Sequence, residues 1–233
     1  MAQEIKRLPT HIAITPDGNR RWAEKHGVSI FSAHDAGAKR VHDVVEQLID
    51  YQIKYLTLWG FSSDNWKRSN DEVAEIFHLL KAWIERDTPW LHNRKVKLCH
   101  IGRIQPIPQY LQSAINQGVA LTRNNDGMTL ALAFNYGGRP DIIDAIRRLM
   151  DKGVPSHEVD EEMFSTFLDT NGMPDVDLVI RTSGNFRQSN FLLWQTAYSE
   201  YYFTPTLWPD FDTKELEKAL QSYSERPRRF GGD

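Results

Sequence analysis

The sequence contains one cysteine, Cys99, so an internal disulfide is excluded and a reducing cytoplasm is the natural setting. It has no uninterrupted apolar run near the ~20 residues that a membrane span needs. The first ten residues are polar and lack the apolar core of a signal peptide. We therefore expect a cytoplasmic protein, and any contact that it makes with a membrane is expected to be peripheral.

Several motifs of common enzyme classes are missing as well. The histidines are scattered, and no CxxC or HExxH pattern marks a histidine or cysteine metal site. No GxSxG, Walker loop or GxGxxG occurs. The net charge of −3 gives no electrostatic support for nucleic acid as a partner.

What is present is an ordinary composition for one soluble domain spanning residues 1–233, with 40% hydrophobic and 25% charged residues. Strand-like and helix-like patterns alternate along the chain. They predict an α/β fold with a largely parallel sheet of about six strands, flanked by helices on both faces. The predicted strands are 12–14, 54–61, 96–101, 128–134, 177–180 and 201–203, and the main predicted helices are 35–51, 71–92, 108–123, 142–149, 161–168 and 214–223.

The first strand leads into the turn Pro16-Asp17-Gly18-Asn19, and a helical pattern follows it. A strand that delivers a glycine-containing turn to a helix N-terminus forms an anion site, because free N–H groups and the helix dipole point to the same place. A carboxylate there makes sense if a divalent cation bridges it to the anion. We therefore predict a phosphate or diphosphate site with Mg²⁺.

Polar residues also follow other predicted strands, where ligands bind in open α/β sheets. Residues 61–68 either line a pocket mouth or form a helix N-cap with solvated charges. In the loop after 177–180, Arg181, Arg187 and Ser189 suit a diphosphate; the alternative is a surface loop with one paired arginine. Spacing alone favours an exposed Glu200 and a capping or hydrogen-bonded His34. The basic tail 226–232 is either a solvated terminus or an arm that reaches an anion on a neighbouring subunit.

Together these stretches resemble the cis-prenyltransferase family, of the undecaprenyl diphosphate synthase type, from His11 to Gly232. The resemblance rests on six motifs in the family's order: HIAIxxDGNRRWA (11–23), FSSDNWKR (61–68), NYGGR (135–139), DLVIRT (177–182), SNFLLWQ (189–195) and WPDF (208–211).

This resemblance implies an enzyme that joins isopentenyl diphosphate to an allylic diphosphate with cis geometry. It also implies a Mg²⁺ cofactor, a homodimer and a hydrophobic tunnel for the growing chain. By the resemblance, Asp17 is catalytic and engages Mg²⁺, Glu200 is a second metal ligand, and Asn65 is catalytic in the loop near the reacting carbons. The implied substrate-binding residues are Gly18, Asn19, Arg21, Trp22, His34, Phe61, Ser62, Trp66, Arg68, Arg181, Arg187, Ser189, Arg229 and Gly231, the last two completing the partner subunit's site.

The chain departs from the family pattern at two positions. Ile30 stands where an arginine commonly assists the allylic diphosphate, and Asn185 stands where a glutamate is usual. Either change can alter substrate or product. No insertion of the kind that accompanies very long products lies between Phe61 and Gly102, so the sequence favours medium or long products.

The sequence is also compatible with two alternative functions. One is a branching or cyclising relative that couples two allylic diphosphates without isopentenyl diphosphate. The other is a non-catalytic accessory subunit, which is disfavoured because Asp17, Asn19 and Arg21 are all present.

Overall fold

The computed structural model describes residues 5–227. One six-stranded sheet, in the order β3-β4-β2-β1-β5-β6, forms its centre, and every pairing is parallel. This confirms the predicted single α/β domain architecture. The strands are β1 (His11–Thr15), β2 (Tyr55–Ser62), β3 (Lys97–Ile101), β4 (Thr129–Tyr136), β5 (Leu178–Arg181) and β6 (Glu200–Phe203).

The helices agree with the predicted order, and their ends differ by a few residues. The Ser29 side chain accepts the Ser32 N–H, so the second helix begins at Ile30, earlier than its apolar spacing predicts. The helices are α1 (Asn19–His26), α2 (Ile30–Asp50), α3 (Asn70–Asn93), α4 (Gln109–Thr122), α5 (Gly138–Asp151), α6 (Glu161–Ser165) and α7 (Thr213–Glu225), with short 3₁₀ turns η1 (Ser63–Lys67), η2 (Ser156–Glu158) and η3 (Trp208–Asp210).

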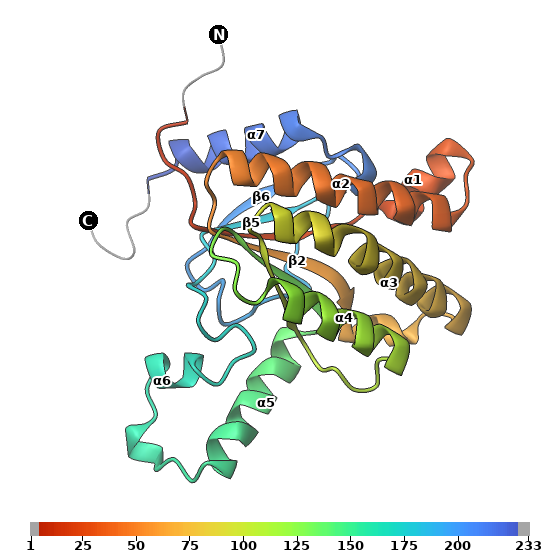
Figure 1. The fold of residues 1–233 in the computed structure, drawn as a ribbon. Helices are drawn as coiled ribbons and strands as arrows, with labels where there is room; N and C mark the ends of the chain where they lie inside the picture. Colours follow the sequence, from red (N-terminus) through yellow and green to blue (C-terminus); the bar gives the residue numbers. More distant parts are fainter. Residues whose placement is uncertain (1–4, 228–233) are drawn as a thin grey trace.

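The two faces of the sheet are covered differently. Ile12 and Ile14 of β1 point into the main core, where α2, α3, α4 and α7 pack as one layer (Figure 1). Ala13, between them, points to a smaller core that includes Phe191 and Leu192. The helices α5 and α6 extend away from the sheet and have a small apolar cluster of their own (Figure 1).

The carboxyl ends of β1 and β5 lie side by side, with Thr15 paired to Arg181. The chain leaves β1 towards β2 on one side and returns later to β5 on the other, so the strand order reverses here. Ligands of open α/β sheets bind at such a reversal. The fold therefore places the loops after β1 and β5 where a ligand site is expected.

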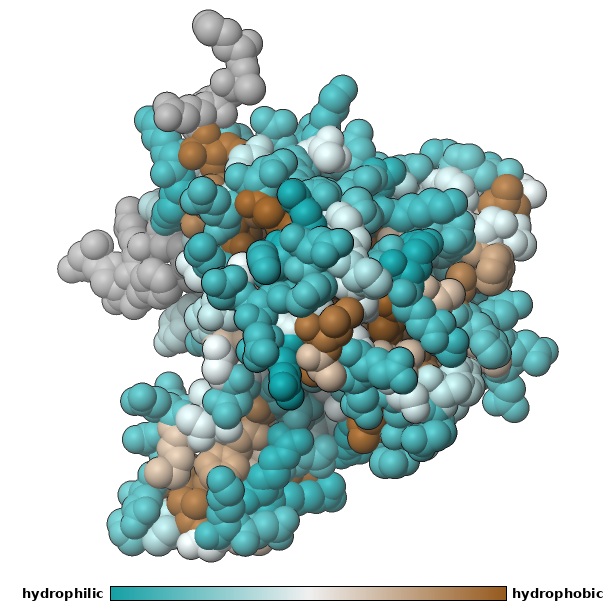
Figure 2. Space-filling model, in the orientation of Figure 1, coloured by the Kyte–Doolittle hydropathy of each residue, from teal (hydrophilic) through white to brown (hydrophobic). Residues whose placement is uncertain are grey.

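In the described part of the chain, no helix is both long and apolar enough to cross a membrane. The face in Figure 2 is mainly hydrophilic, and its apolar side chains form small separate groups.

Candidate active site

An ion pair between a buried arginine and a half-buried aspartate joins the ends of β1 and β5. Arg181 Nη2 donates to Asp17 Oδ2 at 2.9 Å. Arg181 Nη1 donates to the Arg187 carbonyl at 2.7 Å and to Ser189 Oγ at 2.9 Å. Arg181 is only 6% exposed. One guanidinium therefore fixes the turn after β1 and the loop after β5 against each other.

Asn185 extends this network. Its Nδ2 donates to the same Asp17 oxygen at 2.8 Å, and its Oδ1 accepts from Arg187 Nη1 at 3.2 Å. Burial acts to raise the pKa of Asp17, but hydrogen bonds from Arg181 and Asn185 outweigh it and hold the pKa below its ordinary value. Asp17 is therefore a carboxylate at neutral pH.

The turn after β1 leads directly into α1, and Gly18 is the N-cap with a left-handed φ of 108°. A Cβ at this position would lie 2.8 Å from Leu207 Cδ2 and 3.0 Å from Ser183 Cβ. Among residues 5–227, no side chain caps this helix. Its first-turn N–H groups are thus available to an anion, as the sequence predicts.

A second group of charges lies where α1, α2 and α3 meet. Glu72 accepts from Arg20 at 2.8 Å and from Arg68 at 2.9 Å. Burial lowers the pKa of the adjacent His34, and the positive charges of Arg68 and Arg20 lower it further against the opposing effect of Glu72. His34 is therefore neutral at pH 7, and two arginines against one carboxylate leave a net positive charge.

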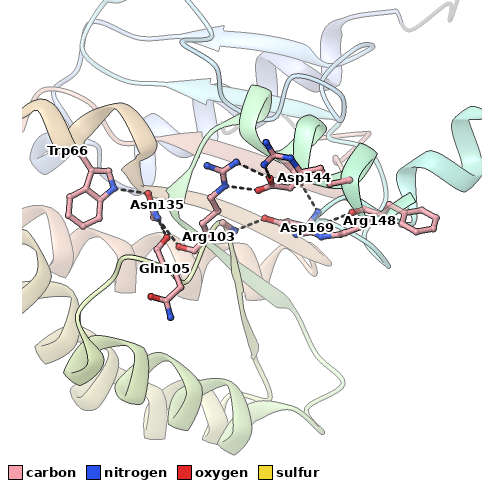
Figure 3. Close-up of polar contacts among 11 residues, drawn as sticks. Trp66, Arg103, Gln105, Asn135, Asp144, Arg148 and Asp169 are labelled. Atoms are coloured by element: carbon pink, nitrogen blue, oxygen red, sulfur yellow. Dashed lines mark hydrogen bonds and ion pairs between the residues drawn. The ribbon is translucent and has the colours of Figure 1, made fainter. Parts of the chain in front are cut away.

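The loop after β2 is held by its own side chains. Asn65 Oδ1 accepts the Ser62 N–H at 3.0 Å, and Ser62 Oγ accepts the Asp64 N–H at 3.1 Å. Trp66 Nε1 donates to Asn135 Oδ1 at 2.8 Å, and Asn135 Nδ2 in turn donates to the carbonyls of Arg103 and Gln105 (Figure 3). Ser62 and Asn65 thus form the N-cap that one interpretation of this sequence expects. The same two residues also line a cavity, as the other interpretation expects.

A cavity of about 470 Å³ opens between these groups. Its polar end is formed by residues after β1, β2 and β5 and by His34 and Arg68. Its other end is apolar and runs between the sheet and the helices α2 and α3. One cavity with an anion-binding end and a hydrocarbon-binding end is suited to an amphiphile with a charged head.

Comparisons with known proteins identify the family. A family model described as "Putative undecaprenyl diphosphate synthase" matches residues 15–231. The chain belongs to this family. An isoprenyl transferase of Fusobacterium nucleatum is 47% identical over 227 residues, which cover 97% of each chain. An isoprenyl transferase of Thermotoga maritima is 44% identical over 230 residues, which cover 97% of this chain and 98% of the relative.

Two solved structures share the fold. Lavandulyl diphosphate synthase from Lavandula x intermedia, in complex with dimethylallyl diphosphate, has a TM-score of 0.93 and 37% identity, covering 96% of this chain and 98% of its own. A probable undecaprenyl diphosphate synthase from Campylobacter jejuni has a TM-score of 0.82 and 32% identity, covering 97% and 99%. The chain is thus an isoprenyl transferase of the cis-prenyltransferase type, as the sequence predicts.

Most of the residues that the sequence predicts for the site of this prenyltransferase meet at one cavity. The cavity is lined by Asp17, Asn19, His34, Phe61, Ser62, Asn65, Arg68, Arg181, Arg187 and Ser189. Gly18 lies in the adjoining turn, and Arg21 Nη2 donates to the Ser183 carbonyl behind the site at 2.9 Å. Trp66 does not line the cavity, but its ring packs edge-on against Phe61. Arg229 and Gly231 lie outside the described residues.

Two predicted site residues are placed elsewhere within the chain. Trp22 stacks on His26 and donates to Asp210 Oδ1 at 2.7 Å, so its indole is held away from the cavity. Glu200 begins β6 in register with Leu178, whereas Asp17 contacts Arg181, about 10 Å further along the neighbouring strand. Glu200 instead accepts from Arg226 at 2.9 Å. Within one chain, therefore, the structure does not bring the two predicted metal ligands together.

Other residues of the site were not predicted. Trp208 lines the cavity and donates to the Gly37 carbonyl at 2.9 Å. A Cβ on Gly37 would lie 2.8 Å from the Trp208 ring, so this glycine lets α2 approach the site closely. Glu72 and the bridging role of Asn185 were missed as well. A glycine inside an apolar helix pattern is a signal for such an approach, but no local pattern reports the side-chain pairing.

The residues at the polar end fit a magnesium ion that is shared with a substrate. Asp17 supplies a carboxylate, and the buried Asn19 Oδ1 has no hydrogen-bond partner among the described residues. Mg²⁺ in such sites uses one or two protein oxygens together with phosphate oxygens and water. No cluster of three or more histidine, cysteine or carboxylate side chains suited to a metal occurs within residues 5–227. The donor set therefore suits a metal that arrives with a diphosphate.

Proposed function

We propose that the enzyme condenses isopentenyl diphosphate with an allylic prenyl diphosphate, with Mg²⁺ as cofactor, to give a cis-prenyl diphosphate. The observation that carries this proposal is the single cavity with cationic side chains and a helix N-terminus at one end and a hydrocarbon-lined space at the other. An allylic diphosphate has the same distribution of charge and apolar surface.

The polar end carries candidate diphosphate ligands on two different sets of elements. We assign the allylic diphosphate to the α1 N-terminus with Asn19, His34 and Arg68. We assign isopentenyl diphosphate to Arg181, Arg187 and Ser189. The Asp17–Arg181 ion pair links the turn before α1 to the loop that holds the second group. A bidentate guanidinium suits a diphosphate, and holding two substrates in one cleft removes much of the entropic barrier to their reaction.

In this assignment, the allylic C–O bond breaks while the isopentenyl double bond attacks the allylic carbon. Isopentenyl C2 then loses a proton to the departing diphosphate, and the new double bond forms. Negative charge grows on the leaving diphosphate, and the α1 amides and Arg68 lie where they stabilise it. The neutral His34 donates or accepts a hydrogen bond without adding charge. Asn65 and Ser62 face the cavity from the loop after β2, where we place the reacting carbons. Apolar walls exclude water from the carbocation-like centre.

We assign Mg²⁺ to Asp17 and Asn19 together with diphosphate oxygens. When bound, the ion supplies Lewis-acid stabilisation of the leaving diphosphate. Asp17 is ionised for this task because Arg181 and Asn185 hold its pKa down. A metal role for Glu200 needs a second subunit, because the residue lies at the far end of β6 within its own chain.

A homodimer is part of the proposal. Ile143, Ile146 and Met150 form one exposed apolar stripe on α5, and Met150 is 73% exposed. Phe186, in the loop of the site, is 78% exposed. An apolar stripe of this kind suits an isologous contact. The cytoplasmic location and the peripheral membrane contact expected from the sequence also belong to the proposal, supported by the free Cys99 and by the lipid nature of the product.

The test is incorporation of labelled isopentenyl diphosphate into allylic primers by the purified enzyme, with Mg²⁺ or with excess chelator. We expect an extended product only with the metal. The proposal fails if no primer of any length is extended.

One observation supports a second candidate function. The structure of lavandulyl diphosphate synthase in complex with dimethylallyl diphosphate matches this chain with a TM-score of 0.93, against 0.82 for the undecaprenyl-type structure. The second candidate is therefore the coupling of two allylic diphosphates. Incubation with dimethylallyl diphosphate alone separates the two functions, because only this second one yields a larger diphosphate without isopentenyl diphosphate.

A further inference from the structure

The apolar end of the cavity is short, and this bears on the size of the product. Its walls come from two neighbouring strands and from one face of each of two helices. The strand residues are Leu58, Trp59, Gly60 and Phe61 of β2 and Leu132 and Phe134 of β4, and the helix residues include Val41 of α2 and Ile76, Leu80 and Trp83 of α3.

On each strand and helix that lines the cavity, the residues next to the lining mark where the cavity ends. On the same face of the sheet, the next residues inward are Leu56 and Leu130, which are fully buried and belong to the core. On α2, the residues one turn beyond Val41 are Val44 and Val45, which are also closed core. The cavity therefore stops at one level, set by Leu58 and Leu132 on the sheet, Val41 on α2 and the buried indole of Trp83 on α3.

The depth of the apolar section follows from backbone geometry. Ile76 to Trp83 spans seven residues of helix, which is about 10 Å at about 1.5 Å per residue. Phe61 back to Leu58 spans three residues of strand, which again gives about 10 Å. An extended chain advances about 1.2 Å per bond, so one isoprene unit of four main-chain bonds is about 5 Å long. The section holds about two such units along its length.

The volume gives an independent measure. A dry cavity of about 150 Å³ accommodates benzene, which corresponds to about 25 Å³ for each carbon. At that density, the cavity of about 470 Å³ holds about 19 non-hydrogen atoms. One diphosphate group has nine non-hydrogen atoms. An allylic diphosphate whose head group lies inside this volume therefore leaves room for about ten carbons, which is about two isoprene units.

Resting on the proposed function, we propose that this enzyme makes short products of about two isoprene units, and that Trp83 is the residue that stops the growing chain. This differs from the medium or long product that the sequence favours. The absence of an insertion before Gly102 excludes very long products only, whereas the indole of Trp83 and the side chains of Leu58 and Leu132 set the limit for this chain.

The wild-type enzyme and two matched variants test the proposal by mass spectrometry of the product. Trp83→Leu opens the end of the cavity, and we expect it to lengthen the main product by at least one isoprene unit. Trp90→Leu is the control, because Trp90 lies on the same helix seven residues further on, stacks on His42, and does not line the cavity. We expect it to leave product length unchanged. Leu80→Ala, a smaller change in the same wall, gives the same direction of effect if Trp83→Leu folds poorly.

Two outcomes overturn the proposal. One is a wild-type enzyme that extends farnesyl diphosphate by several units. The other is a Trp90→Leu variant that lengthens the product as much as Trp83→Leu does.

Binding of non-reactive allylic thiolodiphosphates, measured by calorimetry, tests the cavity apart from turnover. Affinity that peaks at about two isoprene units supports the proposal, and affinity that continues to rise with geranylgeranyl and longer chains overturns it. A peak at short chains combined with no incorporation of isopentenyl diphosphate would refute the proposed reaction while leaving the size limit intact.

Discussion

Arg181 and Asp17 form the contact on which both halves of the site depend. The carboxylate follows β1, the guanidinium ends β5, and Arg181 Nη2 donates to Asp17 Oδ2 at 2.9 Å. The same guanidinium holds the Arg187 carbonyl and Ser189 Oγ through its Nη1 atom. A single buried side chain thus sets the distance between the two groups of anion-binding residues.

Arg181→Lys keeps the charge but loses the fork that makes these contacts. We expect kcat/KM to fall about 100-fold and the free energy of unfolding to fall by about 1–3 kcal/mol, because a buried guanidinium that donates to three acceptors is lost. Steady-state kinetics and urea unfolding measure the two effects. Arg147→Lys is the control, since the Arg147 side chain is 67% exposed and pairs with Asp144 at the surface. Equal losses in both variants would contradict the central place of Arg181.

Asp17→Asn removes the charge with little change in shape. We expect kcat to fall at least about 100-fold, because a charged group acting on the leaving diphosphate is lost. The free energy of unfolding should fall by about 1–2 kcal/mol, because a charge-assisted hydrogen bond becomes a neutral one. Kinetics at saturating Mg²⁺ and urea unfolding provide the measurements. Activity near that of the wild type would remove Asp17 from the metal site.

Gly18→Ala places a methyl group against Leu207 and Ser183 at a backbone angle that alanine rarely adopts. We expect a nearly inactive enzyme, because the turn that leads into α1 must shift. Gly27→Ala is the matched control: its φ is also positive, at 63°, but no atom in the described part of the chain lies within 4 Å of the added carbon. That variant should lose only about 1 kcal/mol of stability and keep its activity. Assays of both variants under the same conditions decide the point.

Variants of Asn135 test how its side chain supports the loop after β2. Its φ is 52°, so glycine tolerates the backbone conformation and alanine does not. Asn135→Gly removes the amide that holds Trp66, Arg103 and Gln105, and we expect kcat to fall several-fold. Asn135→Ala should be less stable than Asn135→Gly by about 1 kcal/mol in urea unfolding. Trp66→Phe removes only the indole N–H donor and should reproduce most of the kcat effect without the difference in stability.

Stability should fall in mildly acidic solution because of buried histidines. Burial lowers the pKa of His11 below its ordinary 6.5, against the opposing effects of the Pro174 carbonyl and Asp177. The unfolded chain then binds more protons than the folded one between the two pKa values, so unfolding is favoured as pH falls through that window. The neutral, buried His11 makes its full contribution to the free energy of unfolding above pH 6.5. Asp17, whose pKa is also lowered, loses its contribution only when the pH falls below about 3.8.

The check is urea unfolding at pH 7.5 and pH 5 for the wild type and His11→Gln. We expect a smaller pH effect in the variant, with the remainder due to His34 and His100, whose pKa values burial also lowers. An equal pH effect in both proteins would exclude His11 as a source.

The sequence identifies the strands and the polar residues that follow them because periodicity and turn chemistry are local. It does not give the order in which strands pair, and this order decides that Asp17 meets Arg181 while Glu200 lies at the far end of β6. Trp22 belongs to a motif that lies at the site, but its position on α1 turns the indole towards Asp210. In the sequence, Asn185 stands where a carboxylate is expected. In the fold, its side-chain amide donates a hydrogen bond to Asp17. Such outcomes depend on contacts between residues far apart in the chain.

Under the proposed function, this chain catalyses cis-prenyl transfer at the site that contains Asp17 and Arg181. The most direct measurement is the geometry of the double bond formed when the purified enzyme, Mg²⁺, isopentenyl diphosphate and an allylic primer react, determined by NMR of the product alcohol. We expect a new double bond of Z configuration, formed by the wild type and lost in Asp17→Asn. A product with an E double bond, or an equal yield from Asp17→Asn, would contradict it.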